Sequence, residues 1–245
     1  MITLFRRIRE KLIASGSFTK YLLYAIGEIL LVVIGILIAL QVNNWNSEQR
    51  DRNISIEYHN RLIAEIDQRI KGIESEIERA GEISQGLSQA VEVLEKREIN
   101  DSTKAILDYA LSRYNQLAPF SFQLVSYEEM KSSGRLSLIY DIDLRQELNG
   151  YFDRAIIVSN IISQLNKDVN GSNQLFDKYV RVYINEERSG RSIDYDALAI
   201  SKDPLLINTL SRFAYVWDTY QYFLRNIIER MEQLQVAIQL ELDSF

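Results

Sequence analysis

The feature that most constrains this chain is an apolar run from Tyr21 to Val42, in which Glu28 is the single charged residue. As a helix, the run would measure roughly 33 Å, enough to cross a bilayer core of about 30 Å. Aromatic residues near its two ends, Tyr24 and Trp45, match the belts that flank membrane spans. The run therefore predicts one transmembrane helix over residues 21–42.

Two other interpretations of this run are weaker. A cleaved signal peptide usually has an apolar core of about 7–15 residues followed by a small-residue cleavage site, and no such site precedes Trp45. A buried helix of a soluble protein would leave the basic and aromatic flanks unexplained. No other segment is apolar enough to span, so the sequence predicts a single-pass protein.

Charge is distributed unevenly along the chain. Residues 1–20 hold five basic residues against Glu10, a local charge of +4 within a formal net charge of -6. Basic flanks remain in the cytoplasm, so we expect residues 1–20 to be cytoplasmic and residues 43–245 to be extracytoplasmic. The acidic balance of the larger part argues against nucleic acid as a partner.

After Trp45, apolar residues recur every three or four positions, which is typical of amphipathic helices. The first such helix extends to Leu94, and its glycines predict a bend between residues 72 and 86. Asn100 begins a capping cluster for a short helix over Thr103–Tyr114. Residues 116–140 are expected to be irregular, apart from a helical piece at about 124–133.

Two more long helices follow, and their apolar residues alternate at spacings of four and three, the seam of left-handed coiled-coil packing. The first begins at Asp141 or Asp143 and continues to Tyr183. Residues 186–203 form a polar loop, and no segment alternates as a strand would. The last helix begins at Pro204, capped by Asp203, and its seam is Leu206, Leu210, Phe213, Trp217, Tyr220, Leu224, Ile227, Met231, Leu234 and Ile238.

These patterns predict an all-α protein. An N-terminal transmembrane helix would continue into an elongated antiparallel helical bundle with coiled-coil-like packing. One apolar stripe could instead pair with its copy in a second subunit, because helices of this length usually extend beyond a partner in the same chain.

Residues suited to catalysis or metal binding are scarce. The chain has one histidine, His59, and no cysteine, so thiolate sites and nucleophile triads lack their components. The acidic residues of 141–147 are best interpreted as helix caps, and Asp194 and Asp196 as part of a solvated loop. We therefore predict no catalytic residue, no cofactor and no metal site.

Aromatic residues cluster in the last two predicted helices. Tyr183, Trp217 and Tyr220 could line a surface for a partner or a ligand between helices. Ordinary core packing is the alternative explanation for the same residues.

Glu28 lies roughly 10 Å inside the predicted span, where an ionised carboxylate costs at least a few kcal/mol. It shares a helix face with Gly35 and Ala39, a small-xxx-small pair that lets two helices approach closely. We expect this face to contact a second copy of the chain or another membrane protein. Two alternatives remain: a neutral Glu28 that faces lipid or headgroups, and proton conduction.

Two stretches of the chain have a recognisable sequence: KYLLYAIGE at Lys20–Glu28 with the apolar sequence that follows, and SYEEMKSSG at Ser126–Gly134. Both stretches resemble a family of single-span membrane proteins of unknown function from Bacteroidota bacteria. The resemblance implies an inner-membrane anchor with a periplasmic helical domain. It implies no activity, ligand or catalytic residue.

The sequence thus favours a membrane-anchored periplasmic helical module that binds a partner protein or a ligand and does not catalyse a reaction. The alternative is a proton-linked stator-like subunit of a membrane complex that uses Glu28. Such subunits share the layout of a short cytoplasmic segment, one acidic span and a periplasmic domain. The long helical pattern here departs from their compact domains.

Overall fold

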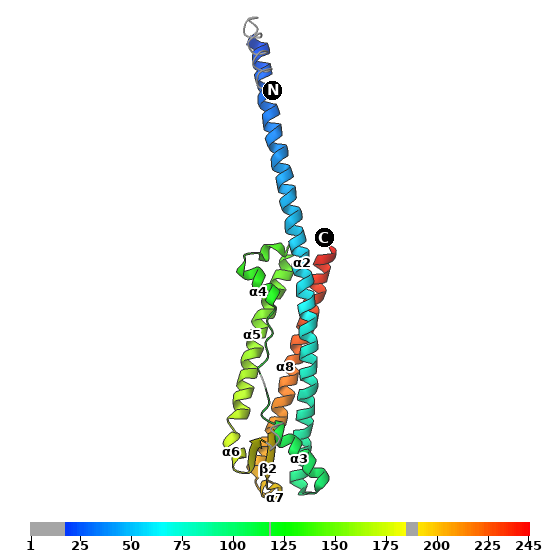
Figure 1. Ribbon diagram of the computed structural model, residues 1–245, viewed down its shortest axis with the longest axis vertical. Helices are drawn as coiled ribbons and strands as arrows, with labels where there is room; N and C mark the ends of the chain where they lie inside the picture. The colour runs from blue at the N-terminus through cyan, green and yellow to red at the C-terminus, as the bar shows by residue number, and fades with distance from the viewer. Residues whose placement is uncertain (1–17, 118, 185–190) are drawn as a thin grey trace. The chain divides into compact units, whose positions relative to one another are not determined.

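The computed structural model in Figure 1 describes residues 18–117, 119–184 and 191–245. The chain divides into two units, Met1–Ser55 and Ile56–Phe245. Helix α2 (Phe18–Lys96) contributes residues to both units. Helices make up most of the described chain, which confirms the all-α class.

In the first unit, the described residues belong to α2, which includes the whole apolar run. The predicted basic segment lies largely outside the described residues, which begin at Phe18. The side chains of Tyr21 and Tyr24, expected at one membrane interface, are also outside the described set.

In the second unit, α2 continues without interruption to Lys96, so the glycines do not break it. The predicted stripe supplies most of its buried residues, namely Tyr58, Leu62, Ile66, Ile73, Ala80, Ile83, Leu87 and Leu94. Ala90 and Val93 are buried off the stripe, and Ile70, Ile77 and Val91 on it are only half-buried. Packing of this stripe outweighs the cost of roughly 1 kcal/mol for a glycine inside a helix. The close packing of α3 explains the lack of a side chain at Gly86, because a Cβ there would lie 2.7 Å from Cδ1 of Tyr109 on the next helix.

Helix α3 (Asp101–Arg113) confirms the predicted short helix and its cap. The Asn100 side chain accepts hydrogen bonds from the amides of Ser102 and Thr103, at 3.0 and 3.1 Å. The Thr103 hydroxyl accepts in return from the Asn100 amide, which completes a capping box.

An irregular segment, described at residues 116–117 and 119–124, follows α3 and leads to α4 (Val125–Ser132), as predicted. A 3-10 turn, η1 (Leu136–Leu138), comes next. Helix α5 (Ile142–Asn170) then begins at Asp141, whose side chain accepts from the amides of Asp143 and Leu144. The structure thus selects Asp141 rather than Asp143 as the cap.

The prediction that this helix continues to Tyr183 is wrong. Helix α5 ends at Asn170, and a five-residue helix, α6 (Asn173–Asp177), follows. Strands β1 (Val180–Ile184) and β2 (Arg191–Tyr195) then form an antiparallel hairpin. The expectation of no strand is therefore also wrong: Val-Arg-Val-Tyr-Ile is a short run of strand-forming residues.

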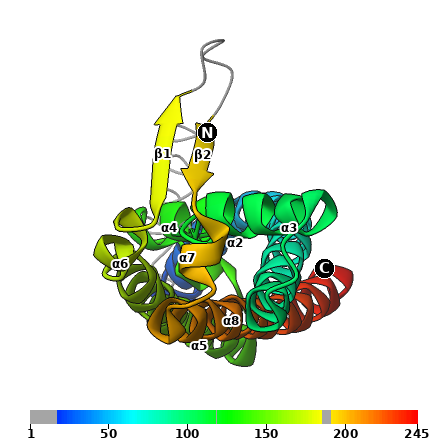
Figure 2. The ribbon, with the colours of Figure 1, turned by 90° about the horizontal axis from the view of Figure 1, so that it is seen from below.

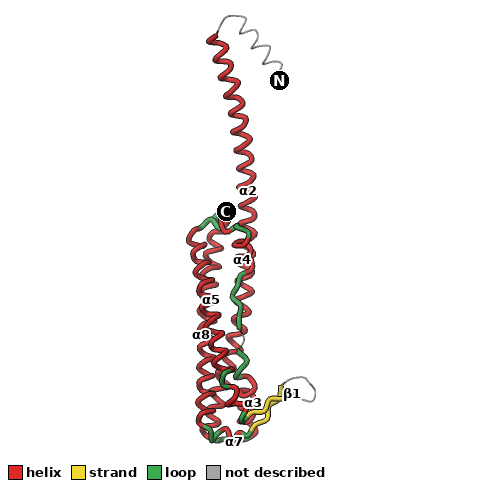
Figure 3. Tube along the Cα trace, turned by 90° about the vertical axis from the view of Figure 1, so that its left-hand side faces the viewer, coloured by secondary structure: helices red, strands yellow, loops and turns green. Residues whose placement is uncertain are grey.

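The predicted loop at 186–203 contains more order than expected, although residues 185–190 are outside the described chain. It includes β2 and a short helix, α7 (Ala197–Ile200), capped by Asp196. The last helix, α8 (Pro204–Asp243), begins where predicted, with the Asp203 side chain accepting from two amides of its first turn. Helices α5 and α8 lie side by side (Figures 1 and 3), and all ten seam residues predicted for α8 are buried.

Candidate functional site

The apolar run is the first candidate site. Every large apolar side chain described from Leu22 to Val42 is 43–67% exposed. Exposed apolar surface of this extent is unfavourable in water and marks a site of contact with lipid or protein. Within the described chain, α2 is the one helix long and apolar enough to cross a membrane.

The predicted interface residues lie within this run. Glu28 is partly exposed and Ala39 is exposed. A Cβ placed on Gly35 would meet no atom within 4 Å. Because α2 is continuous, the three residues point within about 40° of one another around the helix. The face that they define has room for a second helix to approach.

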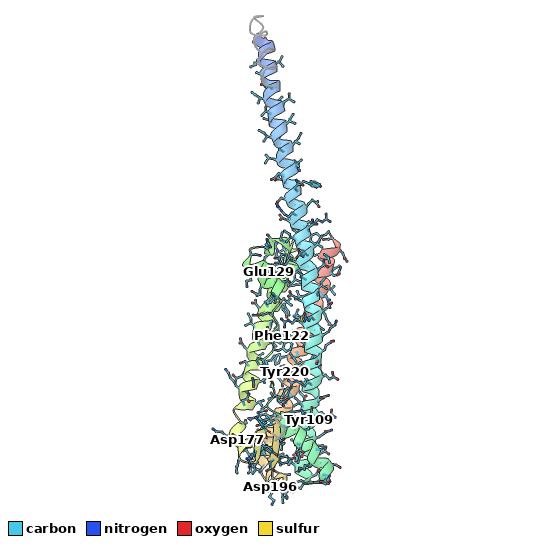
Figure 4. The ribbon with its side chains drawn as sticks, viewed as in Figure 1. Tyr109, Phe122, Glu129, Asp177, Asp196 and Tyr220 are labelled. Carbon is cyan, nitrogen blue, oxygen red and sulfur yellow. The ribbon has the colours of Figure 1, made fainter. Side chains whose placement is uncertain are left out.

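The three aromatic residues of the other predicted surface are not brought together. Trp217 and Tyr220 are fully buried on α8 and contact each other edge-to-face, with ring centroids 5.9 Å apart. Figure 4 shows Tyr220 in the interior of the domain. Tyr183 lies instead on β1, where it is exposed. The core explanation therefore accounts for Trp217 and Tyr220, and Tyr183 belongs to a separate surface.

The buried aromatic residues stabilise the C-terminal end of α3 and the irregular segment that follows it. The Trp217 Nε1–H donates to the carbonyl oxygen of Tyr114 at 3.0 Å. The Tyr151 hydroxyl donates to the carbonyl oxygen of Phe122 at 2.7 Å. Backbone carbonyls outside helices and sheets need such donors when they are buried. Burial raises the pKa of the Tyr151 hydroxyl, which keeps it a donor.

A buried polar cluster surrounds His59, and sequence reasoning did not predict it. The His59 Nε2 lies 3.0 Å from Oε2 of Glu241, and both side chains are almost completely buried. The other oxygen of Glu241 accepts hydrogen bonds from the backbone amides of Tyr140 and Asp141. The Phe245 ring packs edge-on against His59, at 5.6 Å between centroids. This His59–Glu241 cluster joins α2, the start of α5 and the end of α8.

A signal for the cluster was present in the sequence. Glu241 is three residues beyond Ile238, so it occupies the next position of the α8 seam. A carboxylate at a buried seam position needs a polar partner, because an unpaired buried charge is costly. The partner itself is distant in sequence and could not be identified from spacing.

The SYEEMKSSG stretch forms α4 and the turn after it, and it is held against α2. Glu65 accepts hydrogen bonds from the Ser126 hydroxyl at 2.6 Å and from the Ser126 amide at 3.1 Å. Arg61 and Tyr58 donate to Glu129, which holds the pKa of that carboxyl below its usual value. Figure 4 marks the position of Glu129 on this helix. The stretch thus attaches α4 to α2 within the domain.

Glu65 takes the place of an N-cap for α4, because Leu124 at the cap position makes no side-chain hydrogen bond. We expect Glu65→Ala to lower the free energy of unfolding by about 1 kcal/mol, the usual cost of a lost helix cap. Glu65→Gln retains an amide oxygen and should cost less. Chemical denaturation followed by circular dichroism measures both, and equal costs would contradict the capping role.

One groove of the domain, of about 590 Å³, lies between α5 and α8 and is lined largely by polar side chains, including Glu147, Arg154 and Arg230. In the residues described, no group of three or more histidine or acidic side chains is placed to hold a metal ion.

Comparisons with protein-family models, with curated proteins and with solved structures found no match. The resemblance to single-span Bacteroidota proteins therefore stays a prediction from the two sequence stretches. The candidate site is defined by the geometry of this chain alone.

Proposed function

We propose that the chain is a membrane-anchored helical module that binds a partner protein or a ligand without catalysing a reaction. The observation that carries this proposal is the exposed apolar run on α2. Insertion of this run into lipid removes its apolar surface from water. Each Å² removed stabilises the inserted state by roughly 25 cal/mol. No comparable apolar run is exposed elsewhere in the described chain.

We further propose that residues 21–42 span a bacterial inner membrane, with residues 1–20 in the cytoplasm and residues 43–245 in the periplasm. The basic residues before the span support this orientation, because positive flanks remain in the cytoplasm. The resemblance to single-span Bacteroidota proteins supports the same compartment.

Within the domain, we propose that the long helices form an antiparallel bundle with coiled-coil-like packing. The support is the buried alternation of four and three on α5 and α8, a period that keeps one seam in contact. A bundle of this kind offers extended surfaces to a partner, rather than an enclosed active site.

The face of Glu28, Gly35 and Ala39 is the proposed contact with another span. Its partner would be a second copy of this chain or a different membrane protein. Small residues allow close helix approach, and a carboxyl group can donate or accept a hydrogen bond across the contact.

The test is purification of the full chain in a mild detergent, with mass spectrometry of the proteins that accompany it. We expect Glu28→Leu and Gly35→Leu each to lower recovery of the partner, or of a second copy, whereas Leu37→Val on the opposite face of the helix should not. If both variants insert normally and retain every wild-type contact, the interface is refuted. A multi-span partner that needs Glu28 would favour the stator-like alternative.

A further inference from the structure

The β1–β2 hairpin is the one element of the described domain that extends away from the helices (Figure 2). Its register places Val180 opposite Tyr195, Val182 opposite Ile193 and Arg181 opposite Asp194. Side chains alternate between the two faces of a strand, so Val180, Val182 and Ile184 share one face. The hairpin therefore has one apolar face.

This apolar face is exposed over the second half of β1, whereas Val180 at its start is buried. The side chains of Val182 and Ile184 are 56% and 70% exposed. An isolated two-stranded hairpin is marginally stable in water and needs further strands or packing against a helix. Packing of β2 against α3 supports one side of this hairpin and leaves Val182 and Ile184 of β1 exposed.

The two edges of the hairpin differ. β2 contacts α3, where the Tyr195 hydroxyl donates to Asp108 at 2.7 Å. β1 pairs with β2 alone among the described strands, so its outer edge presents unpaired amide and carbonyl groups. Natural edge strands are usually protected by charged side chains, proline or a bulge, and in Val-Arg-Val-Tyr-Ile the charge of Arg181 is the single device of this kind. The open edge of β1 is suited to pairing with another strand.

We propose that β1 pairs with β1 of a second copy of this chain, antiparallel and centred on Val182, to form a four-stranded sheet. In this register, Val182 faces Val182 of the second copy, and Val180 faces Ile184. Arg181 faces Tyr183, and the same two residues already form a cation–π contact within one chain, with Arg181 Cζ 5.9 Å from the ring centroid. The apolar faces of the two hairpins would join into one surface.

Charge selects this register over a neighbouring one. A pairing centred on Arg181 would place two arginines directly opposite each other, which is destabilising. A pairing centred on Val182 instead places each guanidinium opposite an aromatic ring, a favourable contact. The strand is thus complementary to itself in charge as well as in apolar pattern.

The orientation of the hairpin suits a parallel pair of domains. The strands run across the direction of α5 and α8, and Figure 2, which views the domain along these helices, shows the broad side of the sheet. The twofold axis of an antiparallel edge pair stands perpendicular to the sheet. It would therefore run along α5 and α8, so both domains would point the same way.

Disulfide cross-linking of the full chain tests the proposal, because the chain has no native cysteine. Directly opposite residues in paired strands have Cβ atoms about 4.5–5.5 Å apart, close enough for a disulfide after a small shift. We expect oxidation of Val182→Cys protein in membranes to convert most of it to a covalent dimer. Val236→Cys, at a position on α8 that is 61% exposed, is the matched control and should remain monomeric.

Two outcomes would overturn the proposal. In one, Val182→Cys yields no more dimer than Val236→Cys; in the other, it cross-links to a different protein. The register has its own test, in which Arg181→Cys and Tyr183→Cys chains are produced together. They should cross-link to each other but not to themselves, and self-linkage of either variant at equal yield would refute the pairing centred on Val182.

Discussion

Trp217→Ala should lower the free energy of unfolding by about 3–5 kcal/mol, the range for a large aromatic side chain removed from a core. Trp217 is fully buried at the middle of α8. The substitution also removes the donor for the Tyr114 carbonyl oxygen, which is bonded at 3.0 Å. A buried carbonyl without a donor adds its own desolvation cost. Urea denaturation of the purified chain in mild detergent, followed by circular dichroism, measures the effect.

Tyr222 provides the matched control, because it is an aromatic residue on the same helix but is 60% exposed. Tyr222→Ala should change the free energy of unfolding by about 0.5 kcal/mol or less, as expected for a surface position. If Tyr222→Ala is the more destabilising variant, the buried seam of α8 has been assigned to the wrong face.

Glu241→Ala should lower the free energy of unfolding by about 3 kcal/mol or more, because each buried donor left without an acceptor costs about 1–3 kcal/mol. The substitution leaves His59 and the amides of Tyr140 and Asp141 without the carboxylate that they contact. The end of α8 should then separate from α2 and from the start of α5. Hydrogen exchange of the α8 amides would detect this loosening beside the global loss of stability.

Glu241→Gln separates the contribution of the Glu241 charge to stability from that of its hydrogen-bond geometry. The glutamine oxygen can still accept from the two backbone amides, so the loss should be smaller than for alanine. A double variant, His59→Ala with Glu241→Ala, should cost less than the sum of the single changes, because the residues are in contact. Additive costs would contradict a direct interaction between them.

The sequence predicted the helices that carry strong local signals. Asp203 and Pro204 form a cap and a first turn, and α8 begins there as expected. The α8 seam was also predicted correctly, because ten positions at one period define a face without tertiary information. The Asn100 cap of α3 is another purely local device, and it was found at the expected residue.

The hairpin could not be predicted for a physical reason. Tyr179 and Tyr183 happen to continue the helical spacing of α5, so the period alone favoured a helix. The strand is only five residues long, and β2 is held by a contact between Tyr195 and Asp108 on α3. The composition of β1 favours a strand, but contacts between residues so distant in sequence cannot be identified from spacing. The His59–Glu241 cluster was missed because its two members are likewise distant.

The central claim is that residues 21–42 anchor the chain and leave the domain outside the cytoplasm. Single-cysteine labelling with a membrane-impermeant maleimide tests it most directly, since the chain has no cysteine of its own. The reporters are Tyr215→Cys, at a position that is 72% exposed on α8, and Ser15→Cys in the basic segment. In spheroplasts, the account predicts labelling of Tyr215→Cys but not of Ser15→Cys, with the protein retained in membranes after alkaline extraction. Protection of Tyr215→Cys, or release of the protein by alkali, would contradict it.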